Sequence, residues 1–569
     1  MVFRKDANEK TFGENASADS GSQELEWTGA GELPPNVSVN AQGHPTYMGA
    51  SGNKLGWLIT CAASAGFALF GYDQGVMSGI IGAPQYFETF PAVDPAVQGS
   101  SRASILSAFY VSIYEIGCLA GAIFALIWGD KLGRRKMMFS GSVVLCIGVL
   151  IQVTSFRGHW AGGQFVFGRT ITGIGTGFLT STIPTWHADH GELASSDYCL
   201  PFVLALTPVR PDLWISSGTC VAYWVDLGFS YLPGSGSWRG PIALQVIFAF
   251  ALVGLVWFLP ESPRWLISKG HLVEGQRVVA ALEPAPFNSE VVILQTRVIL
   301  DSVQGHTHAK KRDLLTNGPT QHFRRMLIGA SSQFFQQIGG CNAVIYFSTP
   351  IFQNYLGLDR QLALILGAVL ATCYALSACI SFPLVDRFGR RKLFFIGSIG
   401  QSLSMFLIMA CLIPGTDNPA INGSVVGLFL YLVVFGFTWL ELPWLYPAEI
   451  NPLRTRTMSN AASTITNWLF NFAVVMLTPP FLERTAIGTF AFFGAINLCF
   501  IPFIHIFYPE TAGRSLEEID VIFARGYVQK KSYVHVAKEL PALTTAEVAA
   551  EWQSMGLGEL PDQEAGAAH

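Results

Sequence analysis

The stretch GDKLGRRK (residues 129–136) returns later in the chain as DRFGRRK (residues 386–392). A second pair of similar stretches is LPESPRWL (259–266) and YPETAGRSLEE (508–518). The residues that recur in register in the first pair are Asp130, Gly133, Arg134, Arg135 and Lys136, matched by Asp386, Gly389, Arg390, Arg391 and Lys392. A chain that repeats its motifs once in this way is built from two equivalent halves.

The composition places both halves in a membrane. Of 569 residues, 50% are hydrophobic and only 13% are charged, and the mean hydropathy is +0.39. These values exclude an ordinary soluble domain. The net charge of -4 indicates no particular partner, and the sequence contains no phosphate-binding loop, metal-ligand cluster or nucleophile motif of an enzyme.

Apolar segments of about 20 residues, the length needed to cross a bilayer, occur in two groups of six. The predicted spans are 57–82, 103–128, 138–155, 163–186, 212–232 and 241–259, then 326–352, 361–384, 392–413, 425–446, 457–479 and 486–508. We therefore predict an all-α membrane protein of twelve helices. The predicted domains are a disordered N-terminus (1–56), a first half (57–259), a linker with short helices (260–325), a second half (326–508) and a tail (509–569).

Basic residues predict the orientation. Lys and Arg gather in 129–136, in the linker and in 386–392, whereas the alternate loops contain few. Cytoplasmic loops carry this excess, so both termini are predicted to be cytoplasmic.

The repeated loops have two interpretations. Their positive charges set membrane orientation, or their acids accept charge-assisted hydrogen bonds from guanidinium groups and so close the inner face in one conformation. Repetition in register favours a gate. The predicted gating residues are Asp130, Arg134, Arg135, Glu261, Arg264, Asp386, Arg390, Arg391, Glu449, Arg456 and Glu510.

One acid interrupts the first apolar span. Asp73 lies in LFGYDQGVMSGII (69–81), where insertion of a charged side chain costs about 2.5–3.5 kcal/mol. Such a residue is normally retained for a function.

Taken together, the motifs resemble the sugar porter branch of the major facilitator superfamily, most closely its fungal members. The motifs that carry the resemblance are GYDQGVMSG, GDKLGRRK, GRTITGIGTG, PESPRWL, QQIGGCNAVIYFS, DRFGRRK, LPWLYPAEINPLRTR, TNWLFNF and PETAGRSLEE. The resemblance implies a carrier of monosaccharides or polyols that works by alternating access. It implies no cofactor and no metal, and its functional unit is expected to be a monomer in the plasma membrane that binds no nucleic acid.

The resemblance also implies the substrate contacts, which are Gln336, Gln337, Asn342, Trp444 and Asn467. Amides donate and accept hydrogen bonds as hydroxyl groups do, and an indole offers an apolar plate to a sugar ring. Buried amides also serve as links between membrane helices, and adjacent Gln336 and Gln337 point about 100° apart on a helix. Phe70 and Tyr72 are further candidates for the pocket wall, although aromatic residues in an apolar helix also serve as ordinary core residues.

Asp73 matches the carboxylate of proton-coupled members, and Arg169, in FGRTITG, matches its partner. A proton symporter is therefore expected. Two alternatives remain, a permanent ion pair that orients two helices in a facilitative uniporter, and a transporter-like sugar sensor. The sequence does not name the sugar.

The fifth span departs from the family. Position 196 is Ser where the family has arginine, and DYCLPFVLALTPVRPDLW (197–214) is unlike the family and contains Pro208 and Pro211. Prolines interrupt a helix because they lack an amide donor. Natural variation in a loop and a mistaken translation across a gene-structure boundary both explain the segment, and a damaged helix five would leave a chain that folds poorly and transports nothing. No sugar contact is therefore predicted on helix five.

Overall fold

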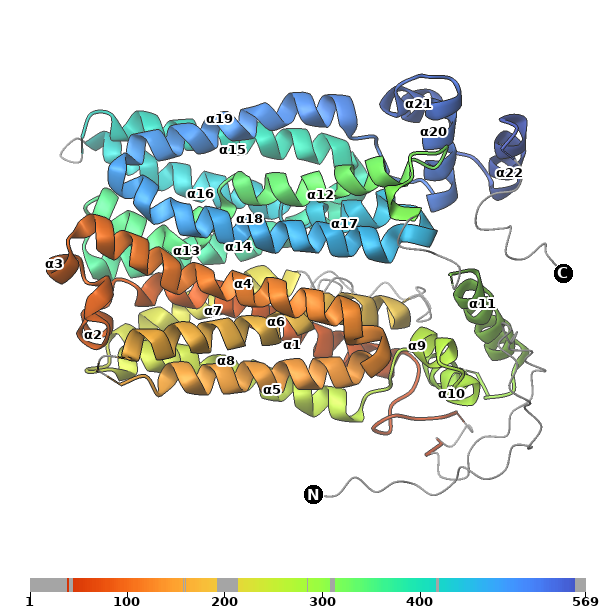
Figure 1. Ribbon diagram of the computed structural model, residues 1–569, viewed down its shortest axis with the longest axis horizontal. Coiled ribbons are helices and arrows are strands. Elements are labelled where there is room, and N and C mark those ends of the chain that lie inside the picture. The colour runs from red at the N-terminus through yellow and green to blue at the C-terminus, as the bar shows by residue number, and fades with distance from the viewer. Residues whose placement is uncertain are drawn as a thin grey trace.

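The computed structural model describes residues 38–39, 44–156, 158, 160–191, 213–283, 285–306, 313–415 and 419–557. Long helices run side by side along the molecule (Figure 1). Nine helical segments in these residues are long and apolar enough to cross a membrane. Three further positions are filled by α6, by α7 and by the pair α12–α13, which completes twelve.

The twelve membrane spans form two groups of six, which we call the N half and the C half (Figure 1). In the C half, the pairs α12–α13 and α16–α17 each fill one span. The N half contains α1 (Asn53–Ile80), α4 (Ser100–Leu132), α5 (Arg134–Val153), α6 (Ala161–Gly191), α7 (Leu213–Ser230) and α8 (Gly236–Phe258). The C half contains α12 (His322–Ile338), α13 (Cys341–Pro350), α14 (Arg360–Phe388), α15 (Arg390–Leu412), α16 (Asn422–Phe437), α17 (Leu442–Ile450), α18 (Arg456–Arg484) and α19 (Ala486–Phe507).

Short helices mark the two ends of the bundle (Figure 1). The end that we call inner carries α9 (Pro263–Ser268), α10 (Leu272–Leu282), α11 (Glu290–His306), η2 (Asp313–Leu315), η5 (Leu453–Thr455), α20 (Leu516–Val528), α21 (Tyr533–Glu539) and α22 (Thr545–Ser554). The outer end carries α2 (Pro84–Thr89), η1 (Pro91–Val93), α3 (Pro95–Gln98), the π-helical turn η3 (Ile351–Tyr355) and η4 (Pro419–Ile421).

Two of the predicted spans contain a break in the helix. The segment 326–352 is interrupted between α12 and α13, and the segment 425–446 is interrupted between α16 and α17. Gly340, at the first break, has a φ of 95°, which a residue with a Cβ rarely adopts. Irregular backbone inside a membrane requires internal hydrogen-bond partners, and the breaks find them at the site described below.

The predicted polar tail contains a docked helix. Ser515 and Glu518 form a capping box at the start of α20, which satisfies amide groups that a helix start otherwise leaves unpaired. Arg325, near the start of α12, pairs with Asp520 at 2.5 Å, and the Gln321 side chain donates to the carbonyl of Phe523 at 2.8 Å. The tail is therefore anchored beneath the C half.

Helix five exists from Leu213 onward as α7 and packs directly on α1. A Cβ atom at Gly71 would lie 1.8 Å from the carbonyl oxygen of Ile215, and one at Gly218 would lie 2.1 Å from that of Ala68. The Thr219 hydroxyl donates to the Gly71 carbonyl at 2.9 Å. The two backbones thus touch with no side chain between them. Ser196 lies outside the described residues, and so does the unusual segment up to position 212, with Pro208 and Pro211.

Candidate functional site

The breaks in α12–α13 and α16–α17 meet near the middle of the C half. The side-chain nitrogen of Gln336 donates to the carbonyls of Trp439 and Leu440, at 2.7 and 3.1 Å. The carbonyl of Gly339 accepts from the Tyr431 hydroxyl at 2.9 Å and from the Asn497 amide at 2.9 Å. Buried polar side chains therefore satisfy the carbonyls that the breaks release.

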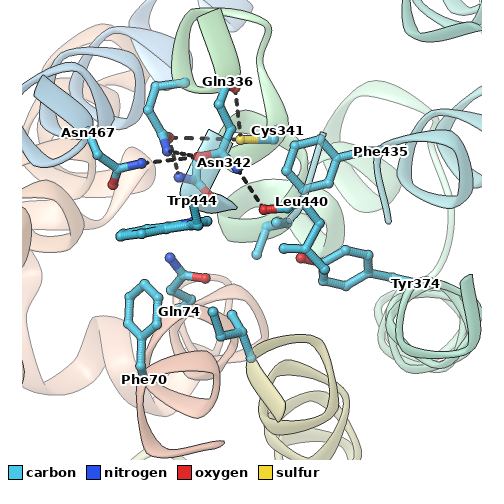
Figure 2. A pocket seen from close by; sticks show the side chains of 13 residues that line it. Phe70, Gln74, Gln336, Cys341, Asn342, Tyr374, Phe435, Leu440, Trp444 and Asn467 are labelled. Carbon is cyan, nitrogen blue, oxygen red and sulfur yellow. Dashed lines mark hydrogen bonds between the residues drawn. The ribbon is translucent and has the colours of Figure 1, made fainter. Parts of the chain in front are cut away.

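A cavity opens beside these breaks, between the two halves (Figure 2). The space between atoms here is about 330 Å³, counting the part that opens to solvent. It is lined by Phe70, Gln74, Ile215, Gln336, Gln337, Cys341, Asn342, Ile345, Tyr374, Phe435, Leu440, Trp444 and Asn467. The five predicted substrate contacts and Phe70 are all among these residues. Tyr72 is not among them, and its hydroxyl donates to the Pro241 carbonyl at 2.8 Å.

The amides at the cavity bind one another. The Asn342 side chain donates to Gln337 at 2.7 Å and to Asn471 at 2.6 Å. The Gln337 side chain donates to Gln336 at 3.2 Å, and Asn467 donates to the same Gln336 oxygen at 3.1 Å. Each amide is therefore held in one orientation, so a bound hydroxyl group would meet fixed partners. Gln336 and Gln337 both reach the cavity, although they are adjacent in α12.

Aromatic side chains supply the apolar walls. Phe70 reaches from α1 toward the C half, where its ring meets the Trp468 ring edge-on at 5.4 Å between centroids, and Trp444 lies near it in Figure 2. Gln74, Tyr374 and the remaining lining residues were not predicted from the sequence. None of the thirteen described lining side chains is Asp, Glu, Lys or Arg. The cavity therefore suits an uncharged ligand that presents both hydroxyl groups and C–H faces.

The predicted ion pair forms next to this cavity. Arg169, in α6, donates to Asp73, in α1, at 2.8 Å, and both side chains are fully buried. The guanidinium carbon lies 4.7 Å from the centre of the Tyr114 ring. Gln74, the residue after Asp73, lines the cavity. The buried pair is thus one residue along α1 from the cavity wall.

A second buried acid was missed. Glu115, in α4, is fully buried and accepts a hydrogen bond of 2.6 Å from the Tyr346 hydroxyl, which belongs to α13 of the other half. The sequence could have identified Glu115 in the same way as Asp73, because Glu115 is also an acid inside an apolar segment, the predicted span 103–128.

At the inner end, each half contains a carboxylate bound to the start of a helix. Glu261 accepts from the main-chain amides of Arg134 and Arg135, both at 3.1 Å, at the start of α5. Glu510 accepts from those of Arg390 and Arg391, at 2.9 and 3.2 Å, at the start of α15. The positive end of a helix dipole favours an anion at this place. These two acids therefore bind amide groups, where we had expected guanidinium groups.

The guanidinium groups have other partners. Arg390 binds Glu449 at 2.7 Å and lies 3.5 Å from Asp386, while Arg134 binds Asp130 at 2.6 Å. The Arg135 guanidinium donates to the carbonyl of Trp257 at 2.5 Å. The Arg391 guanidinium donates to the carbonyl of His505 at 2.8 Å. The remaining predicted gate residues, Arg264 in α9 and Arg456 at the start of α18, also interact with neighbouring groups. The described contacts of the repeated loops lie within one half each.

The contacts that join the halves gather at the outer end. The Ser78 hydroxyl donates to Thr349 at 3.3 Å, the Tyr223 hydroxyl lies 2.6 Å from the Ser348 hydroxyl, and Arg360 binds the carbonyl of Gly82. These residues belong to the outer parts of α1, α7, α13 and α14. The two halves are therefore closed on each other at the outer side of the cavity.

The inner ion pairs give a testable contrast. Arg390 binds Glu449 through two nitrogens and is 11% exposed, whereas the Asp130 partner of Arg134 is 72% exposed. Hydrogen bonds to charged groups contribute about 1.5–3 kcal/mol when sheltered, and exposed pairs about 0–1 kcal/mol. We expect Arg390→Ala to slow uptake about tenfold or more and Arg134→Ala to slow it less than about fivefold. Uptake normalised to surface protein checks this, and equal losses would contradict it.

Twelve helices in two repeated halves around an amide-lined central cavity define a membrane carrier. The chain belongs to the sugar transporter family, because residues 58–523 match the family model described as sugar (and other) transporter. The predicted family and the twelve-helix major facilitator fold are thereby confirmed. This is a family of integral multi-pass membrane transporters and not of enzymes.

Individual relatives agree with this assignment. The chain is 43% identical to the sugar transporter STL1 of Saccharomyces cerevisiae, over 91% of this chain and 90% of that protein. It is 40% identical to the major facilitator superfamily transporter mfsA of Aspergillus fumigatus, over 90% and 94%. Among solved structures, the proton:xylose symporter XylE has a similar fold, with a TM-score of 0.68, 24% identity, and coverage of 83% of this chain and 99% of that chain.

Proposed function

We propose that this protein imports a neutral monosaccharide or polyol together with a proton, by alternating access. The observation that carries the proposal is the buried Asp73–Arg169 pair, one residue from an uncharged, amide-lined cavity. The pair contains a carboxylate that can bind and release a proton, and the cavity contains groups that suit hydroxyls. The name of XylE, a proton:xylose symporter, supports the same combination.

The proposed orientation follows from the basic loops. The inner end, with both termini, faces the cytoplasm, and the membrane is the plasma membrane. A single chain is the proposed functional unit, because the cavity is formed by the two halves of one chain. No metal or cofactor takes part in this mechanism.

Proton coupling changes what the carrier can do. A proton that moves down a potential of 100 mV supplies about 2.3 kcal/mol, which is enough for roughly fiftyfold accumulation of a neutral substrate. A uniporter with the same fold would only equilibrate its substrate. A sensor would bind the sugar without uptake.

We expect the addition of a transported sugar to raise the external pH of a weakly buffered suspension of expressing cells, because each sugar enters with a proton. The host should lack its own sugar carriers, and labelled hexoses, pentoses and polyols should be compared. Uptake without a pH change would identify a uniporter and overturn proton coupling. A complete lack of uptake across the panel would favour a sensor.

A further inference from the structure

Glu115 and Tyr346 form a hydrogen bond that crosses between the halves close to the cavity. The phenol oxygen lies 2.6 Å from the carboxylate oxygen, and both side chains are fully buried. Tyr346 is one helical turn after Asn342 in α13, and Asn342 lines the cavity. The bond therefore connects a cavity helix of the C half with α4 of the N half.

The position of this bond matters for opening. Beyond Tyr346 toward the outer end, α13 continues to Ser348 and Thr349, which contact Tyr223 and Ser78 of the N half. Tyr346 thus lies between the cavity and the outer contacts. A path from outside to the cavity requires α13 to leave the N half, and this movement separates Tyr346 from Glu115.

The bond is also short. The hydroxyl oxygens of Ser78 and Thr349 lie 3.3 Å apart, whereas the oxygens of Tyr346 and Glu115 lie 2.6 Å apart, as close as the hydroxyl oxygens of Tyr223 and Ser348. The Asn471 side chain, in α18 of the C half, also interacts with the Glu115 carboxyl group. Tyr346 donates the hydrogen bond of 2.6 Å to this buried acid.

We propose that the Glu115–Tyr346 hydrogen bond is a latch that keeps the outer path closed by holding α13 against α4. The latch rests on the alternating-access part of the proposed function and does not depend on proton coupling. Tyr114, beside Glu115 in the chain, faces the Arg169 guanidinium, so the latch lies directly next to the ion pair.

Cys341 provides a native reporter of the open path. It lines the cavity and is 2% exposed, so a membrane-impermeant methanethiosulfonate reagent added outside reaches it only when the outer path is open. The chain has ten cysteines. Subtracting the labelling of a Cys341→Ser counterpart isolates the signal of this one.

We expect Tyr346→Phe and Glu115→Leu each to raise the initial labelling rate of Cys341 from outside about tenfold, equivalent to about 1.4 kcal/mol. The double variant should label no faster than either single variant, because both changes remove the same bond. Labelling from the inner side, measured in inverted vesicles, should fall. Glu115→Gln keeps an acceptor for the phenol and should label more slowly than Glu115→Leu.

Ser112→Ala is the matched control. Ser112 lies almost one turn before Glu115 in α4 and makes only a weak contact of 3.5 Å with Met476 of the C half, so labelling should stay at the unmodified rate. Labelling of both single variants at the unmodified rate, or a double variant that shows the product of two independent increases, would overturn the latch. Because labelling needs no substrate, a protein without uptake contradicts the proposed function and leaves this test intact.

Discussion

Replacing Asp73 with asparagine is expected to abolish the accumulation of substrate against its gradient while exchange of labelled for unlabelled substrate continues. Asparagine has nearly the shape of aspartate and can still accept a hydrogen bond from Arg169, but it does not bind and release a proton. The accumulation ratio should fall from as much as roughly fiftyfold at 100 mV to about one. Steady-state uptake in energised cells and counterflow in vesicles measure the two quantities.

Asp226 offers a matched control for this variant. It is also a buried acid in a membrane helix, 4% exposed, but it lies in the outer part of α7 and accepts a hydrogen bond from the Gly79 amide at 3.1 Å. Asparagine preserves that acceptor, so Asp226→Asn should still accumulate substrate. Normal accumulation by Asp73→Asn would show that the ion pair only orients α1 and α6, and proton coupling through Asp73 would be abandoned.

The second large effect is expected at Asn342. Alanine at this position removes the donor that holds Gln337 and Asn471, at 2.7 and 2.6 Å, and also removes a polar group from the cavity wall. A lost hydrogen bond that leaves a partner unsatisfied costs about 1–3 kcal/mol. We therefore expect kcat/KM for uptake to fall by roughly 5- to 150-fold, mainly through weaker substrate binding.

Gln152→Leu tests whether any buried amide has this effect. Gln152 links α5 to α6 through a hydrogen bond of 2.7 Å to Thr172 and is absent from the cavity lining. Its replacement should lower the amount of protein in the membrane more than the KM of the protein that remains. If Asn342→Ala and Gln152→Leu change KM equally, the amides of α12 and α13 would be only links between helices.

The sequence repeat predicts the two halves and their equivalent inner loops because it depends only on the order of residues. The binding of Glu261 and Glu510 to main-chain amides could not be predicted in the same way, since those groups are present in every residue and only the helix starts at Arg134 and Arg390 expose them. The sequence shows that Glu261 and Glu510 each have a basic stretch as a counterpart. Only the folded structure shows that each acid binds the main-chain amides of that stretch.

The cavity, too, could be predicted from the sequence only in part. The resemblance to a family identified the amides, and Gly436 and Pro443 flank the break between α16 and α17, but these residues do not reveal which side chain binds the carbonyls that the break releases. The break is stabilised by Gln336, which is about a hundred positions earlier in the chain. Glu115, in contrast, was visible as an acid in an apolar span, and only its partner Tyr346 required the structure.

The backbone contact of α1 with α7 has a mechanical consequence. Because no side chain separates α1 from α7 at Gly71 and Gly218, the two helices do not slide past each other and move as one rigid unit. This unit includes Asp73 and the cavity residues Phe70 and Ile215. The C half contains joints instead, at the breaks beside α13 and α17. The carrier therefore combines a rigid helix pair in the N half with interrupted helices in the C half. Added bulk at Gly71 would separate α1 from α7, whereas a less flexible residue at Gly340 would restrict the movement of α13 relative to α12.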